Sequence, residues 1–239
     1  DQLSTVYHVY VDQDYIGQVD DQAVVQTIID AKLEKGKQEF ENVNIVIGES
    51  ISYIQEKVFN PKYNNENVKN ELEETLTIKT EAVALHIDGD IVGHFKDKET
   101  AEKVIESYKA KFVSEDVLKA LDVDKQGDNE EPQELELGDS LIEEVKLSKD
   151  ITFSEEKANP DDILDHKQGV KLLEKGTIEE KVHKVQEGDV LGGIASQYDL
   201  TVDQLLDLNP SLEEDSLLQI DQEIHVTEPK PLVDVVVKE

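Results

Sequence analysis

The sequence predicts an α+β fold: two related small α+β units, followed by a βααβ module near the C-terminus. Alternating apolar residues that give way to helical spacing occur twice, and a third, shorter stretch has two helical patterns between two strand patterns. Hydrophobic residues make up 37% of the 239 residues, which is enough for several small cores but not for one large core.

Composition excludes several classes of function. The formal net charge is -32, and all 24 basic residues are lysine. Such a surface repels nucleic acid and anionic membranes, because both need positive patches to displace counterions. The absence of cysteine excludes disulfides and thiolate zinc sites. No stretch approaches the roughly 18 apolar residues of a membrane helix, so we expect no membrane insertion.

The first half of the duplicated unit is a predicted hairpin followed by a helix. The segment "VYVDQDYIGQVDDQAVVQTII" from Val9 matches "LHIDGDIVGHFKDKETAEKVI" from Leu85 at a constant offset of 76 residues. The aligned pairs are Asp12 with Asp88, Gly17 with Gly93, and Asp21 with Asp97. Each copy predicts a strand, a turn, a second strand and a helix that begins after Asp21 or Asp97. The expected buried positions of the helices are Val24, Ile28 and Ala31, and Ala101, Val104 and Ile105.

The second half of the unit repeats at an offset of 100. The aligned residues are Ile51 with Ile151, Tyr53 with Phe153, and Thr77-Ile78 with Thr177-Ile178. A short second helix is expected after Asn60-Pro61 and after Asn159-Pro160. The larger offset requires 24 extra residues, which we assign to an acidic insertion at about 112–140. The units are therefore predicted at 1–80 and 81–181.

The duplicated region carries no catalytic pattern. Paired copies of a small fold most often serve as a spacer or as a platform for a protein partner. A small-molecule site between the copies is the alternative.

The acidic insertion contains one candidate calcium loop. Its candidate ligands are Asp122, Asp124, Gln126, Asp128 and Glu130, with Gly127 at the sixth place. The twelfth place is Gln133 where a bidentate glutamate is expected, so the site would be weak. A plain solvated acidic loop is the alternative interpretation.

The remaining candidate chemistry is sparse, and we expect no catalytic residue, cofactor or metal in this chain. The six histidines are His8, His86, His94, His166, His183 and His225, and none forms an HxH or HExxH pattern. We expect His183 and His225 to be exposed residues of two paired strands that could face each other. Neither a GxSxG elbow nor a phosphate loop is present.

The pattern of the C-terminal module, residues 182–227, predicts a strand, two helices and a second strand. His183 to Val185 alternate as a strand, and Asp189 is placed to cap a helix whose apolar face is Leu191, Ile194, Ala195 and Tyr198. Thr201 and Gln204 form a capping box for a second helix. Asn209 suits the left-handed conformation that ends helices, and Pro210 stops the helix.

This stretch resembles a LysM domain, the small module that binds peptidoglycan and chitin. The residues that carry the resemblance are Val185, Gly188-Asp189, Leu191, Ile194-Ala195, Tyr198, Leu205, Leu208-Asn209-Pro210 and Ile224-His225-Val226. The resemblance implies that an N-acetylglucosamine chain lies between two loops. The implied contact residues are Gly188, Asp189, Val190, Leu191, Gly192, Pro210, Ser211 and Leu212.

Three positions depart from the family pattern. Val190 replaces the usual threonine, Gly192 stands where a larger residue is common, and Asp221 replaces the turn glycine. The first two departures remove a hydroxyl and some contact area, so we expect weaker binding, by about 1 kcal/mol for each lost hydrogen bond. A degenerate, purely structural module is therefore the alternative.

The order of the parts resembles the N-terminal, non-catalytic half of Gram-positive cell-wall peptidases of the lysostaphin type. In those proteins a β-rich domain and a zinc endopeptidase follow, so residues 228–239 are expected to be a linker or the start of such a domain. Because the chain lacks methionine, we expect a processed or cloned fragment of an extracellular protein of the cell wall or surface. The implied function is peptidoglycan binding that positions a wall endopeptidase. The alternative is a docking or regulatory ectodomain.

Overall fold

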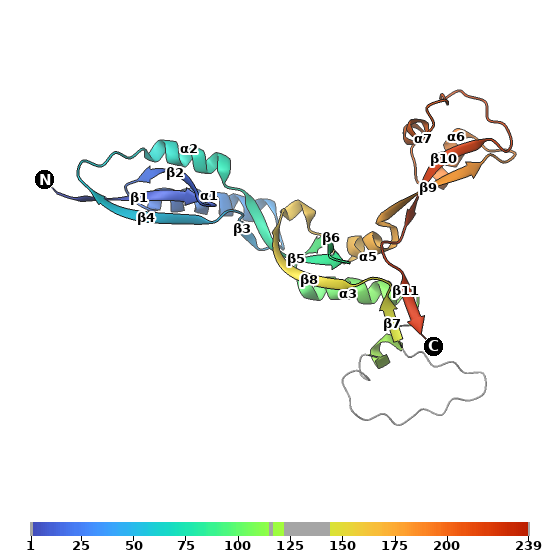
Figure 1. The fold of residues 1–239 in the computed structure, drawn as a ribbon, viewed down its shortest axis with the longest axis horizontal. Coiled ribbons are helices and arrows are strands. Elements are labelled where there is room, and N and C mark those ends of the chain that lie inside the picture. The colour runs from blue at the N-terminus through green and yellow to red at the C-terminus, as the bar shows by residue number, and fades with distance from the viewer. Residues whose placement is uncertain (1, 115–116, 122–143, 239) are drawn as a thin grey trace. The chain divides into compact units, whose positions relative to one another are not determined.

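The computed structural model describes residues 2–114, 117–121 and 144–238 (Figure 1). Helices and sheets are mixed within it, so the predicted α+β class is confirmed. The contacts divide the chain into two compact units, residues 1–102 with 150–165 and residues 103–149 with 166–239. Each unit is described by itself.

The first unit begins with a three-stranded antiparallel sheet in the order β2-β1-β4. Its strands are β1 (Ser4–Val11), β2 (Asp14–Val19) and β4 (Ile51–Val58), and its helices are α1 (Ala23–Glu39) and α2 (Asn65–Thr75). Apolar residues of the sheet and of both helices form one core: Val9, Val11, Val19, Val25, Ile28, Val68, Leu72 and Leu76. The buried stripe of α1 thus runs through Val25 and Ile28, whereas the expected Ala31 is exposed.

A second sheet in this unit is built around the long strand β5 (Ile78–Ile87). The start of β5 pairs with β3 (Ile45–Ile47), and its later part pairs with β6 (Asp90–Phe95). Along its length β5 also pairs with β8 (Ile151–Ala158), which the short helix η1 (Pro160–Asp162) follows. One continuous strand therefore closes the first repeat and opens the second.

The duplication is visible in matching turns. In the first repeat, the N–H of Asp12 donates to Ser50 O at 2.8 Å, and Asp12 Oδ1 accepts from Ser50 N at 2.8 Å. Asp88 and Asp150 exchange the same two bonds at 2.9 Å each. Both aspartates are left-handed, with φ of 48° and 49°. The predicted relation between the copies thus extends to individual hydrogen bonds of the backbone and of the aspartate side chains.

The second unit contains most of the remaining elements. It takes the end of α3 (Lys98–Lys109), a helical segment at 117–121, β7 (Glu144–Leu147) and α5 (His166–Lys175). The chain continues through β9 (Thr177–Lys184), α6 (Leu191–Gln197), α7 (Val202–Leu208), β10 (Glu223–Lys230) and β11 (Val235–Lys238). The expected buried residues of α3 are confirmed, and Tyr108 joins them.

The strand that follows α5 is not the structural counterpart of the strand that follows α2. The sequence repeat aligned Ile178 of β9 with Ile78 of β5. In the first repeat Ile78 pairs with Ile47 of β3. Leu147 of β7 occupies the position of Ile47, but it pairs with Val235 of β11. The aligned residue Ile178 pairs with β10 instead, so this part of the sequence alignment is wrong.

Backbone hydrogen bonds lead to the same assignment of β11. Gly48 N donates to Thr77 O at 2.9 Å, and in the second repeat Ser148 N donates to Asp234 O at 2.8 Å. Residues 177–230 therefore form an insertion between α5 and the last strand of the second repeat. The sequence could not show this, because the inserted segment begins with the same Thr-Ile pair that opens β5.

Two hydrogen bonds hold the chain at residues 232–233, directly after the insertion. Leu232 N donates to Leu173 O at 2.9 Å, and the buried hydroxyl of Tyr108 donates to Val233 O at 2.6 Å. Burial raises the pKa of Tyr108, and the nearby Asp234 and Glu174 carboxylates raise it further. The phenol therefore stays protonated and keeps its donor role at neutral pH.

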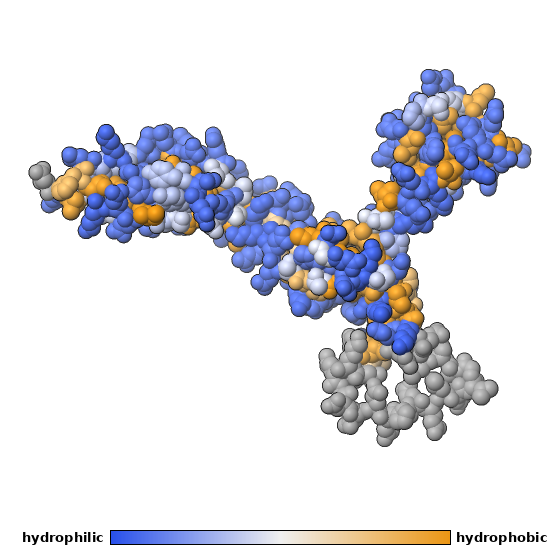
Figure 2. Space-filling view, viewed as in Figure 1, coloured by the Kyte–Doolittle hydropathy of each residue, from blue (hydrophilic) through white to orange (hydrophobic). Residues whose placement is uncertain are grey.

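The face of the molecule shown in Figure 2 is mostly hydrophilic, as the charge of -32 requires. Among the described helices, none combines the length and the apolar character that crossing a bilayer requires. The candidate calcium ligands Asp122, Asp124, Gln126, Asp128 and Glu130 lie outside the described residues. Within the described ranges, no three histidine or carboxylate side chains gather as a metal site.

Candidate functional site

The inserted segment ends in a small closed module around one core. The strands β9 and β10 pair antiparallel, and α6 and α7 contribute the other side of the core. Its buried members are Val185, Leu191, Ile194, Ala195, Leu205, Ile224 and Val226. The strand-helix-helix-strand order and the apolar face of the first helix match the prediction from sequence.

Helix α7 begins as predicted, whereas α6 does not. The Thr201 hydroxyl accepts from Gln204 N at 3.1 Å, and the Gln204 side chain accepts from Thr201 N at 2.9 Å, which completes the capping box. The N-cap of α6 is Val190, and no side chain caps this helix. The expectation that Asp189 caps α6 is wrong because its carboxylate is bonded elsewhere.

Asn209 ends α7 through its side chain. Its φ of -131° is not the left-handed conformation that we expected. The amide nitrogen donates to Leu205 O and to His225 O, both at 2.8 Å, and the amide oxygen accepts from His225 N at 2.8 Å. These three bonds tie the loop after α7 to β10, so the loop begins from a fixed point.

His183 is buried, contrary to the sequence expectation. It pairs with Ile224, whereas His225 pairs with Val182, so the two histidines point to opposite faces. The alternation of side chains along a strand could have predicted this burial. His183 lies two residues before the core residue Val185, so the two side chains share one face of the strand.

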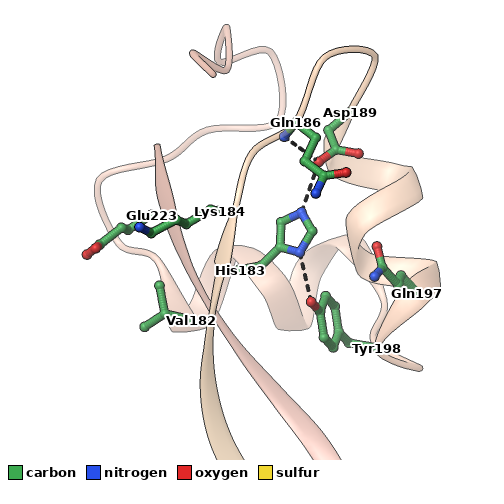
Figure 3. Close-up of a pocket in the computed structure, with 8 residues that line it drawn as sticks. All are labelled: Val182, His183, Lys184, Gln186, Asp189, Gln197, Tyr198 and Glu223. Carbon is green, nitrogen blue, oxygen red and sulfur yellow. Dashed lines mark hydrogen bonds and ion pairs between the residues drawn. The ribbon is translucent and has the colours of Figure 1, made fainter. Parts of the chain in front are cut away.

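The His183 ring connects three segments of the module. One ring nitrogen lies 2.7 Å from the Tyr198 hydroxyl and the other lies 2.9 Å from Asp189 Oδ2. The same carboxylate oxygen accepts from Gln186 N at 2.8 Å. Figure 3 shows this chain of bonds running from the end of α6, through the strand, to the loop before α6. The loop 186–190 is thus held in one conformation by side chains that the sequence interpretation did not single out together.

This arrangement predicts an acid-sensitive loop. The hydrogen bond from the Gln186 backbone lowers the pKa of Asp189, and the His183 hydrogen bond lowers it further. A carboxyl with a lowered folded pKa stabilises the fold above its unfolded pKa of about 3.9, and this contribution disappears as the pH falls through the folded pKa. We expect the difference in melting temperature between wild type and Asp189→Asn to be largest above the unfolded pKa of about 3.9 and to shrink as the pH falls through the lower folded pKa. Thermal melts from pH 2 to 7 test this, and a pH-independent difference would contradict it.

The eight predicted glycan contacts have different surroundings. Gly188, Val190, Gly192, Pro210 and Ser211 are exposed, and Asp189 and Leu212 are partly buried. Leu191 is buried in the core, so only its backbone is available to a ligand. Leu191 and Leu212 pack in the same core, which anchors the two loops to one rigid base. Contact of these residues with a glycan stays a prediction.

An open cavity of about 510 Å³ lies beside the loop before α6. Its lining residues are Val182, His183, Lys184, Gln186, Asp189, Gln197, Tyr198 and Glu223 (Figure 3). Of the predicted glycan contacts, only Asp189 lines it, and the loop after α7 contributes none. The cavity is therefore distinct from the space between the two predicted loops, and none of its other lining residues was predicted as a ligand contact.

Residues 183–227 match the LysM domain family. LysM domains bind glycans such as peptidoglycan or chitin, and they usually occur in extracellular or cell-surface proteins. No curated protein and no solved structure matches the chain. The resemblance of this segment to LysM is thus confirmed.

Proposed function

We propose, from the LysM match at residues 183–227, that the chain binds peptidoglycan and positions a secreted wall endopeptidase of the lysostaphin type on it. We assign the hydrolytic chemistry to another part of the parent protein and not to this chain. We further infer a location in the wall or at the surface of a Gram-positive bacterium, where an enzyme positioner of this kind would meet its substrate.

The observation that carries the proposal is that the two loops have fixed backbones and exposed tips. They rise from one closed core, Asn209 and Asp189 fix their backbones, and their tips are exposed. Preorganised loops lose little entropy when they bind an extended ligand. A neutral glycan also needs no positive surface, so the charge of -32 does not oppose its binding.

Single LysM modules bind weakly, and the parent protein would gain from additional contacts on the same polymer. The duplicated units would then act as a spacer between the module and its partners in the wall. A protein-docking role for these units is the second candidate.

Gly192 offers a clean test of glycan binding. A Cβ at this position meets nothing within 4 Å outside its chain neighbours and its own helix backbone, so Gly192→Ala and Gly192→Leu both begin in open space. If the glycan crosses this residue, leucine restores the contact area that the larger residue of the family supplies and strengthens binding by up to about ten-fold, which corresponds to ~1.4 kcal/mol, whereas alanine changes binding little. Co-sedimentation with purified peptidoglycan sacculi measures the effect.

The wild-type chain should sediment with sacculi at low and at high salt, because recognition of a neutral glycan is not electrostatic. Wild-type protein that stays wholly in the supernatant at both salt concentrations rejects the proposed function. Equal binding by the alanine and leucine variants rejects only the placement of the glycan over Gly192.

A further inference from the structure

The cavity beside β9 contains two opposite charges without partners. Lys184 and Glu223 are paired residues of β9 and β10, and both are exposed. Neither makes an ion pair or a side-chain hydrogen bond with another described residue. Elsewhere on the same two strands, Lys181 and Glu228 pair with each other at 3.1 Å. The ribbon geometry therefore allows cross-strand pairing, and Lys184 and Glu223 are left free for another group.

The other lining residues supply hydrogen-bonding groups. The amide of Gln197 has no partner among the described residues. Val185 exchanges backbone bonds with the segment before β10, so the backbone N–H and C=O of the preceding Lys184 point away from β10. Strand β9 has no other strand partner in the described part of the chain. These backbone groups are thus available to an extended peptide.

The cavity and the predicted glycan loop share one wall. Asp189 and Gln186 line the cavity, and Asp189 is also one of the residues that the LysM resemblance places against the glycan. In Figure 3, Val182, Lys184 and Glu223 lie on one side of β9, and His183 with its partners lies on the other. A substituent that branches from a bound glycan could therefore reach the cavity around the shared loop.

We propose that this cavity binds the peptide stem of peptidoglycan, an inference that rests on the proposed glycan binding. The stem is a short peptide with a free carboxylate and, on its diamino residue, a free amine. Lys184 pairs with the carboxylate, Glu223 pairs with the amine, and Gln197 with the Lys184 backbone binds the peptide groups. Chitin lacks such a substituent, so the cavity makes the module selective for peptidoglycan.

The test compares ligands of equal sugar length with and without stems. Isothermal titration of the full chain would use chitotetraose, a peptidoglycan tetrasaccharide stripped of stems, and the same tetrasaccharide with stems. We expect the stem to improve affinity about three-fold, as is typical of an exposed ion pair with partial hydrogen bonding, and to lose this gain at high salt. Lys184→Gln and Glu223→Gln should each remove the gain and leave the stripped ligands unaffected.

Lys181→Gln and Glu228→Gln are matched controls, because they make the same charge changes on the same two strands. These variants should keep the preference for stems. The proposal is overturned if wild type shows no preference, if the Lys184 and Glu223 variants retain it, or if the controls lose it equally. Binding of stripped ligands without a preference leaves the proposed function intact, whereas failure of all three ligands to bind removes both.

Discussion

Replacing Leu205 by alanine should unfold the LysM module and abolish glycan binding. Leu205 is fully buried, in the same core as Ile194 and Ile224, which are both 1% exposed. A buried Leu→Ala change costs about 2–5 kcal/mol, through lost transfer free energy and the cavity left behind. A module of about 45 residues buries too little surface to absorb such a loss. Amide NMR spectra would show the collapse, and sacculi sedimentation would show the loss of binding.

Leu217→Ala is the matched control for this prediction. The Leu217 side chain is 93% exposed, so the same change of atoms removes no packing. We expect wild-type melting and unchanged amide spectra outside its own loop. If Leu205→Ala keeps the spectrum of wild type, the core assignment of the module is wrong.

Excising the whole insertion should leave the rest of the chain folded. Thr177 and Lys230 are paired residues at the base of the β9–β10 ribbon, so two glycines can replace residues 177–230 without stretching the backbone. The shortened chain would lose all glycan binding. Its second repeat should keep the pairing of β7 with β11, and hydrogen exchange of β7 would measure this. Unchanged localisation of the shortened chain on cells would favour the protein-docking role.

A chain that ends after Leu232 provides the opposite case. It keeps the module but loses β11 and the buried Val233, whose carbonyl accepts from Tyr108. Burial of a valine contributes about 1.5–3 kcal/mol, and an unpaired buried hydroxyl costs ~1–3 kcal/mol more. We expect the second repeat to lose exchange protection while glycan binding persists. The conclusion that residues 177–230 are an insertion would be contradicted by two results. One is exchange protection of the second repeat that survives the truncation, and the other is protection that is lost when residues 177–230 are excised.

Features set by neighbouring residues could be predicted from the sequence. The capping box of Thr201 and Gln204, the β1–β2 and β5–β6 hairpins, and the apolar face of α6 all depend on residues a few positions apart. Local patterns of this kind leave few alternatives, so interpretation and structure agree.

Features set by competition between distant segments could not be predicted. Two stretches that begin with Thr-Ile and a third that begins with Val235 all suit a strand, and only packing against the second repeat selects β11 as the partner of β7. Likewise, Asp189 suits a helix cap by position, but the ring of His183 and the Gln186 backbone compete for its carboxylate and hold it. Local propensity shows which segments can form a strand or cap a helix, but contacts between distant segments determine which of them does so.

The place of the insertion has a mechanical consequence. Tension applied to the backbone on either side of the LysM module would pass from α5 to β11 through the hydrogen bond from Leu232 N to Leu173 O. While this hydrogen bond holds, the module lies outside the path of the load, and stretching the chain does not pull the loops before α6 and after α7 apart. A force that arrives through a bound wall polymer would instead pull on β9 and β10 together, along the direction of both strands. Two strands loaded in this way separate less easily than two strands that are peeled apart from one end.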